Sequence, residues 1–134
     1  MHNSVIILED EQPRMDRFIP TIEAIDANLK IVRWLDAHVM VREVDAVLSD
    51  ACLISLDHDL YVGEDPGDGM DVANHLATLS PCCPVIVHSS NTDRGRAMIG
   101  ELEYAGWQCY RVLPFGDDWI EAEWRNLVKS IIGM

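Results

Sequence analysis

Five short apolar runs alternate along the chain with segments whose apolar residues recur at helical spacing. The first run, Ser4 to Leu8, is continuous and rich in β-branched residues, as expected of a strand buried on both faces. Strict alternation of this kind favours parallel strands joined by right-handed helical crossovers. The predicted strands are residues 4–8, 30–35, 51–56, 84–87 and 107–113.

The alternation predicts one α/β domain over residues 1–134, a length typical of a single domain. The expected architecture is a doubly wound, five-stranded parallel sheet in the order 2-1-3-4-5, in a flavodoxin-like three-layer sandwich. In that order the chain reverses direction between the first and third strands, and ligands bind beyond the carboxyl ends of strands at such a point. Functional residues are therefore expected just after Leu8, Leu56 and Val87.

Local signals indicate where several helices begin and end. Asp36 is a predicted N-cap, and Asn91 or Thr92 is expected to cap the helix after the fourth strand. Asp117 or Asp118 is expected to cap the last helix in the same way. Pro20 is expected to kink the first helix or to weaken its hydrogen bonding.

Composition and charge exclude several classes of function. The formal net charge is −13, which argues against extended nucleic-acid binding but allows a small phosphorylated ligand held with a divalent cation. No apolar run approaches the roughly 20 residues of a membrane span, and the N-terminus does not resemble a secretion signal. The four cysteines contain no C-x-x-C pair and are interpreted as reduced core thiols. A cytoplasmic protein without a membrane partner is therefore expected.

Polar residues follow three of the predicted strands. Glu9 and Asp10 follow the first strand, and Asp57 follows the third. Adjacent carboxylates repel one another unless a cation compensates, and clustered carboxylate oxygens suit Mg²⁺. The alternative is that these are ordinary loop acids facing solvent in an acidic protein. The fourth strand is followed by His88, Ser89, Ser90 and Asn91.

Four segments resemble a phosphorelay receiver domain: residues 8–12 (LEDEQ), 54–57 (ISLD), 84–89 (PVIVHS) and 110–115 (YRVLPF). The resemblance implies that Glu9 and Asp10 hold Mg²⁺, that Asp57 accepts a phosphoryl group, and that Ser89 is the switch hydroxyl. One position departs from the pattern, because Leu113 stands where receivers have a lysine. Arg111, two residues earlier, could share its strand face.

Residues 56–60 (LDHDL) and 88–91 (HSSN) resemble more closely the cyclic-phosphate-processing receiver-like family. That resemblance implies a role in handling cyclic or terminal phosphates, with a small phosphorylated ligand or a nucleic-acid end as the substrate. RNA repair and nucleotide metabolism are the processes that it suggests.

The residue types at these strand ends suit cyclic-phosphate hydrolysis. Histidine can act as an acid or as a base, so His58 and His88 could supply both groups, and Asp59 could orient His58. Glu9, Asp10 and Asp57 could hold a metal that activates water. Imidazole and carboxylate together also suit Mn²⁺ or Zn²⁺.

The phosphate itself is expected at the fourth strand end. There Ser89, Ser90 and Asn91 open a helix, and the amides of a helix N-terminus favour anions.

Three functions remain open from the sequence. The first is a metal-assisted cyclic phosphodiesterase, and the second is a stand-alone response regulator phosphorylated at Asp57 in two-component signalling. The third is a degenerate receiver that acts as an interaction module, for example as a homodimer through its last helix. Trp119 is expected either to pack in the core or to be exposed at a partner surface.

Overall fold

A computed structural model describes residues 2–133 and contains a five-stranded, all-parallel sheet in the order β2-β1-β3-β4-β5. The predicted fold class and strand order are therefore confirmed. The fifth strand is shorter than the predicted 107–113, because only three of its residues pair with β4. The strands are β1 (Ser4–Leu8), β2 (Lys30–Trp34), β3 (Ala51–Leu56), β4 (Val85–Val87) and β5 (Cys109–Arg111).

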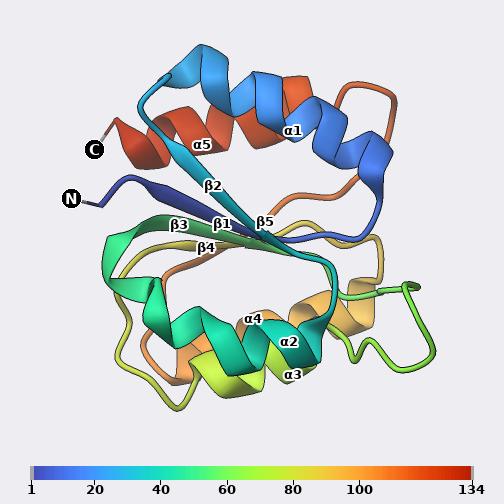
Figure 1. The fold of residues 1–134 in the computed structure, drawn as a ribbon. Helices are drawn as coiled ribbons and strands as arrows, with labels where there is room; N and C mark the ends of the chain where they lie inside the picture. The colour runs from blue at the N-terminus through green and yellow to red at the C-terminus, as the bar shows by residue number, and fades with distance from the viewer. Residues whose placement is uncertain (1, 134) are drawn as a thin grey trace.

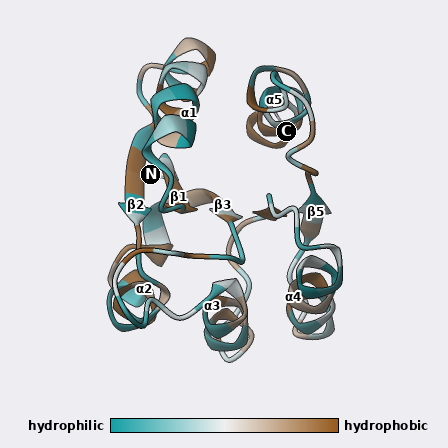
Figure 2. Cartoon of the chain, turned by 90° about the vertical axis from the view of Figure 1, so that its right-hand side faces the viewer, coloured by the Kyte–Doolittle hydropathy of each residue, from teal (hydrophilic) through white to brown (hydrophobic). Residues whose placement is uncertain are grey.

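Helices cover both faces of the sheet. The upper layer in Figure 1 holds α1 and α5, and the lower layer holds α2, α3 and α4. Figure 2 shows the same three layers end-on. No helix in the described part of the chain is long and apolar enough to cross a membrane. The helices are α1 (Gln12–Ile25), α2 (Ala37–Glu43), α3 (Gly69–Leu76), α4 (Thr92–Tyr104) and α5 (Arg125–Ile132).

The two layers bury different kinds of side chain. All five residues of β1 are buried, and alternate residues of the strand supply the two cores. The core beneath α2, α3 and α4 is mainly aliphatic. The core beneath α1 and α5 contains Phe18, Trp119 and Trp124, and the Phe18 and Trp124 ring centroids lie 4.4 Å apart. Trp119 is only 4% exposed, so the alternative that it marks a partner surface is wrong.

The capping predictions have mixed outcomes. Asp36 accepts a hydrogen bond from Val39 N and caps α2, and Asn91 caps α4 by accepting from Arg94 N. The predicted cap at Asp117 or Asp118 is wrong. The last helical segment instead begins after Trp119 with a π-helical turn, η3 (Ile120–Trp124), and has no side-chain cap.

Pro20 lies inside α1, which continues past it to Ile25. After Glu43, the end of α2, the chain continues as two 3₁₀ turns, η1 (Val44–Ala46) and η2 (Leu48–Asp50). All four cysteines are free thiols, but Cys82 is exposed rather than packed in the core.

Candidate phosphate and metal site

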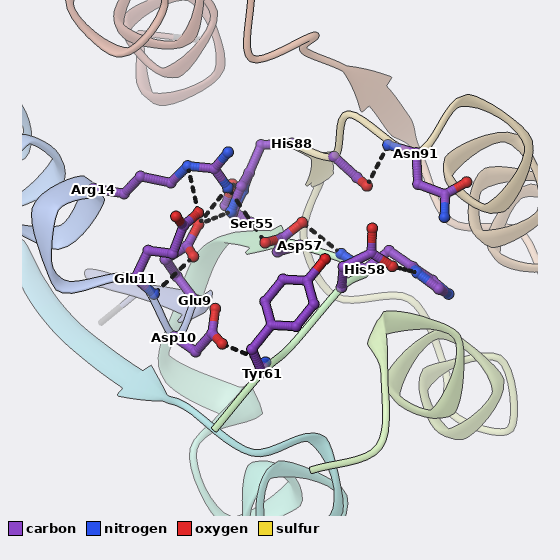
Figure 3. Close-up of polar contacts among 12 residues, drawn as sticks. Glu9, Asp10, Glu11, Arg14, Ser55, Asp57, His58, Tyr61, His88 and Asn91 are labelled. Carbon is purple, nitrogen blue, oxygen red and sulfur yellow. Dashed lines mark hydrogen bonds and ion pairs between the residues drawn. The ribbon is translucent and has the colours of Figure 1, made fainter. Parts of the chain in front are cut away.

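Three strand ends bring their polar successors together. Leu8 pairs with Leu56, and Leu56 pairs with Val87, so the next residue of each strand emerges at the same edge of the sheet. One potential ligand atom from each of Glu9, Asp57 and His88 lies within 4.8 Å of the others. All three side chains are buried, and Figure 3 shows them converging from β1, β3 and β4.

Glu9 and His88 form a buried, hydrogen-bonded pair, and further hydrogen bonds hold the other side of the imidazole. A hydrogen bond of 3.0 Å joins Glu9 Oε1 to His88 Nε2, and one of 2.7 Å joins His88 Nδ1 to Ser55 Oγ. Trp124 Nε1 donates to the same hydroxyl at 3.0 Å. Burial acts to raise the pKa of Glu9, but the hydrogen bond and charge of His88, the Glu11 amide and Arg14 together lower it. Glu9 is therefore an ionised carboxylate with a structural partner for each oxygen.

Asp57 occupies a different electrostatic setting. Its Oδ1 accepts from the backbone N of His58 at 2.7 Å, and its Oδ2 lies 3.3 Å from Arg14 Nη1. Burial raises the pKa of Asp57 to about 6, and the charge of Glu9 adds to this effect against those of His88 and Arg14. A cation beside Asp57 would relieve the cost of keeping its carboxylate ionised.

The start of α3 packs directly against the end of β3. Gly69 N donates to His58 O at 2.9 Å. A Cβ at Gly69 would press against the carbonyl oxygen of Asp57 and would lie 2.8 Å from His58 Cα. Glycine is therefore required there by close backbone approach rather than by its own dihedral angles.

Arg14, from the first turn of α1, supplies the positive charge in the pocket. Its Nη1 lies 3.2 Å from Glu9 Oε1 and 3.3 Å from Asp57 Oδ2. Its Nε contacts Glu11 Oε2 at 3.1 Å, and the guanidinium lies 5.3 Å from the centre of a Trp119 ring. The sequence interpretation missed this residue. The available signal was its position on the helix that begins at the same edge of the sheet as Glu9.

Asp10 lies beside the cluster and serves the loop after β3. Its Oδ2 accepts from Tyr61 N at 2.6 Å, whereas its Oδ1 is buried and has no hydrogen-bond partner. The residues that offer ligand atoms within 4.8 Å of one another are Glu9, Asp57 and His88, and Asp10 of the predicted trio is not among them. The unpartnered Oδ1 is nevertheless an oxygen that a cation would satisfy.

The His58 side chain is turned away from this cluster. A hydrogen bond of 2.7 Å joins its Nδ1 to Asp59 Oδ1, as expected of an orienting partner. Its Nε2 is buried without a hydrogen bond, 3.6 Å from Asp68 Oδ2. Figure 3 shows the ring directed away from Glu9 and Asp57. Only the backbone of His58 contacts Asp57.

A family model matches most of the chain. Residues 5–104 match the model of the family described as the cyclic-phosphate processing receiver domain. The chain belongs to this family. No curated protein sequence matches it.

Solved receiver domains share the fold of this family member at low sequence identity. The response regulator receiver domain from Rhodospirillum rubrum matches with a TM-score of 0.71 and 16% identity, covering 98% of this chain and 94% of that one. The response regulator domain of Thermotoga maritima CheB gives 0.69 and 17%, covering 99% and 96%. The isolated REC domain of Salmonella enterica RcsB, determined with the phosphomimetic BeF3⁻, gives 0.65 and 19%, covering 92% and 86%.

The β4–α4 loop of this receiver domain is braced from β5. Ser89 is buried, and its Oγ accepts from Asn91 N at 3.1 Å, whereas Ser90 is exposed. Arg111 Nη2 donates to the carbonyl oxygens of Ser89 at 2.9 Å and Asn91 at 3.3 Å. Arg111 therefore holds the loop and does not reach Asp57. Leu113, at the position of the receiver lysine, has a partly exposed side chain.

Proposed function

We propose that this receiver domain binds a divalent cation and processes a cyclic or terminal phosphate on a nucleotide or nucleic-acid end. The observation that carries the proposal is the convergence of Glu9, Asp57 and His88 within 4.8 Å, all buried, at the carboxyl ends of β1, β3 and β4. The name of the family supports the class of substrate.

The oxygen atoms at this edge suit a hard divalent cation. Asp10 Oδ1 is buried without a partner, and Asp57 has a pKa of about 6 because it is buried beside Glu9. In the proposal Asp10, Asp57 and Glu9 hold the ion, with Mg²⁺ as the first candidate and Mn²⁺ or Zn²⁺ as the alternatives. The ion would supply charge neutralisation at the phosphate and a water of lowered pKa.

His88 acts through Glu9 in this proposal, because it is fully buried and both of its ring nitrogens are hydrogen-bonded. It orients the carboxylate and does not touch the substrate. Proton transfer is assigned to His58, since the bond from Asp59 to Nδ1 leaves Nε2 for that task. The assignment requires the imidazole to turn from Asp68 toward the phosphate.

The phosphate oxygens are assigned to the start of α4. This helix runs from Thr92 to Tyr104, and its N-terminal amides favour an anion. The Ser89 hydroxyl accepts from Asn91 N and keeps its own hydrogen for donation to a phosphate oxygen. Asn91 contributes as the cap that holds these amides in place, and Ser90 is exposed beside them.

Turnover of 2′,3′-cyclic nucleotides with Mg²⁺ or Mn²⁺ tests the proposal. Wild-type protein is expected to open the cyclic phosphate, and His58→Ala is expected to slow turnover by about 10²–10⁴-fold. His75→Ala is the matched control, because His75 also pairs with an aspartate, Asp45, but lies outside the pocket. Absence of both cation binding and turnover in the wild type would overturn the proposal and favour an interaction module.

A second candidate function is phosphorylation of Asp57 in two-component signalling. It is favoured by the position of Asp57 at the end of β3, with Arg14 at 3.3 Å, and by the solved RcsB domain that carries a phosphomimetic. A small phosphodonor would then add the mass of one phosphoryl group to the intact protein. Asp57→Asn should abolish that adduct, and wild-type protein that gains no mass would contradict this candidate.

A further inference from the structure

The pocket contains no lysine at the position where receivers place one, and the residues nearest that position do not replace it. Leu113 is apolar and follows β5. Arg111 is committed to the carbonyl oxygens of the β4–α4 loop. A Cβ on Gly95 would lie only 2.6 Å from Arg111 Cζ, so the Arg111 guanidinium packs directly against α4. The cation that contacts Asp57 comes from another element, α1.

Arg14 is already aimed at the acceptor edge from α1. One guanidinium nitrogen contacts both Glu9 and Asp57, at 3.2 and 3.3 Å. Trp119 lies under the guanidinium, and Glu11 holds its Nε, so the side chain is fixed on two further sides. The side chain keeps 21% of its surface exposed, which leaves it accessible to a ligand entering the pocket.

We propose that Arg14 is the residue that contacts the phosphate in place of the missing lysine. This inference rests on the proposed phosphate site. The guanidinium group matches phosphate oxygens in pairs through its planar donors, and a cation held beside Asp57 would meet a phosphate bound there. In the absence of a divalent ion, Arg14 neutralises the two buried carboxylates. With the ion bound, the carboxylates have another partner, and the Arg14 donors turn to the phosphate.

A purely structural Arg14 would behave differently. It would offset the repulsion between the Glu9 and Asp57 carboxylates. Its removal would lower the free energy of unfolding without changing the affinity for phosphate. The two roles also differ in the effect on the metal. If Arg14 and the divalent ion share the same carboxylates, removal of Arg14 should leave Mg²⁺ affinity unchanged or stronger while phosphate affinity falls.

Calorimetric titration of inorganic phosphate into Mg²⁺-saturated protein separates these roles. We expect Arg14→Ala to bind phosphate at least about tenfold more weakly, because it loses charge-assisted hydrogen bonds to the phosphate oxygens. Arg17→Ala is the matched control on the same helix, because Arg17 pairs with Glu121 outside the pocket. It should bind phosphate as the wild type does. Unchanged phosphate affinity in folded Arg14→Ala would overturn the inference.

A rescue variant provides a second, independent readout. Arg14→Ala combined with Leu113→Lys returns a cation to the site from the segment after β5, and phosphate affinity should recover in part. Arg14→Gln, which is polar and uncharged, replaces the alanine variant if thermal unfolding shows that the latter does not fold. Wild-type protein that binds phosphate but leaves cyclic nucleotides intact would end the proposed function alone. Turnover with unchanged phosphate affinity in the variants would end only the role of Arg14.

Discussion

The two ends of the parallel sheet differ in what they bury. Among residues 2–133, the ionisable side chains that are buried are Glu9, Asp57, His58 and His88, and all four follow the carboxyl ends of strands. The amino end instead has a hollow of about 770 Å³, lined by residues just before β1, the connection from α1 to β2, the starts of β2 and β3, and the end of α5. None of the carboxylates or imidazoles that line this hollow is buried.

The end of the sheet that buries charged groups is the end where a function is expected. Burying a charged group costs several kcal/mol unless it is paired and hydrogen-bonded, whereas an open hollow carries no such cost. Among residues 2–133, ionisable side chains are buried at one end of the sheet only. Arg14, Ser55 and backbone amides pair with them there and offset the desolvation cost. We therefore assign the site by its buried charge and not by the size of the hollow.

The largest expected effect comes from removing a proposed ligand. Asp57→Asn should reduce cation-dependent turnover of a 2′,3′-cyclic nucleotide by about 10³-fold or more, because metal assistance supplies several kcal/mol of transition-state stabilisation. Asp26→Asn changes an acid at the amino-end hollow and should leave the initial rate unchanged. An equal loss of rate in the two variants would contradict the assignment of the site to the carboxyl end of the sheet.

Close packing behind the site should be visible in stability. Gly69→Ala places a methyl group against the Asp57 carbonyl and should lower the free energy of unfolding by about 3 kcal/mol, as overpacking does. Gly100→Ala is the control in α4, where a Cβ meets nothing within 4 Å. It should raise stability by about 0.5–1 kcal/mol through helix propensity. Denaturant unfolding measures both, and a tolerated Gly69→Ala would refute the close approach.

The hydrogen bonds that Ser55 makes to His88 and Trp124 should give the next largest effect on stability. Ser55→Ala leaves Trp124 Nε1 and His88 Nδ1 buried without their partner and should cost about 2–3 kcal/mol. Cys52→Ala, on the same strand at the amino end, removes a half-buried thiol and should cost less than about 1 kcal/mol. Chemical denaturation measures both losses of unfolding free energy. A loss for Ser55→Ala no larger than that for Cys52→Ala would show that these hydrogen bonds do not stabilise the fold.

The pH dependence of stability should report the charge on Asp57. Its pKa is raised from 3.8 to about 6 by burial, so the folded state binds more protons than the unfolded state between these values. Stability from this group is present below the lower pKa and is lost as pH rises through the upper one. Asp57→Asn should therefore be more stable than the wild type by about 3 kcal/mol near neutral pH, and most of this gain should be lost by pH 4.

Unfolding curves at several pH values test the direction of this change. Saturating Mg²⁺ should raise the stability of the wild type relative to that of Asp57→Asn. A gain for Asp57→Asn that is the same at every pH would contradict a raised pKa.

Much of the fold could be predicted because it depends on local pattern. The continuous apolar run of β1 indicates burial on both faces, and alternation with helices restricts the topology. These two features place Glu9, Asp57 and His88 at one edge, since parallel strands end together. The caps at Asp36 and Asn91 were predictable for the same reason, because an N-cap bond joins residues three apart.

The remaining features depend on contacts between distant residues. Arg14 meets Asp57 across 43 positions of sequence, and its place on the helix after Glu9 indicates the edge of the sheet but not the side chain that it contacts. The His58 ring has a choice of acidic neighbours, and its rotamer is decided by Asp59. Trp119 is enclosed by Phe18 and Arg14, so its burial follows from packing of α1 against the last helical segment.

A crystal soaked with Mn²⁺ would locate the proposed cation site. We expect one strong anomalous peak at the carboxyl end of the sheet, within coordination distance of Asp10 and Asp57 carboxylate oxygens, and its loss in Asp57→Asn. A peak in the amino-end hollow with none beside Asp57 would contradict the proposed site.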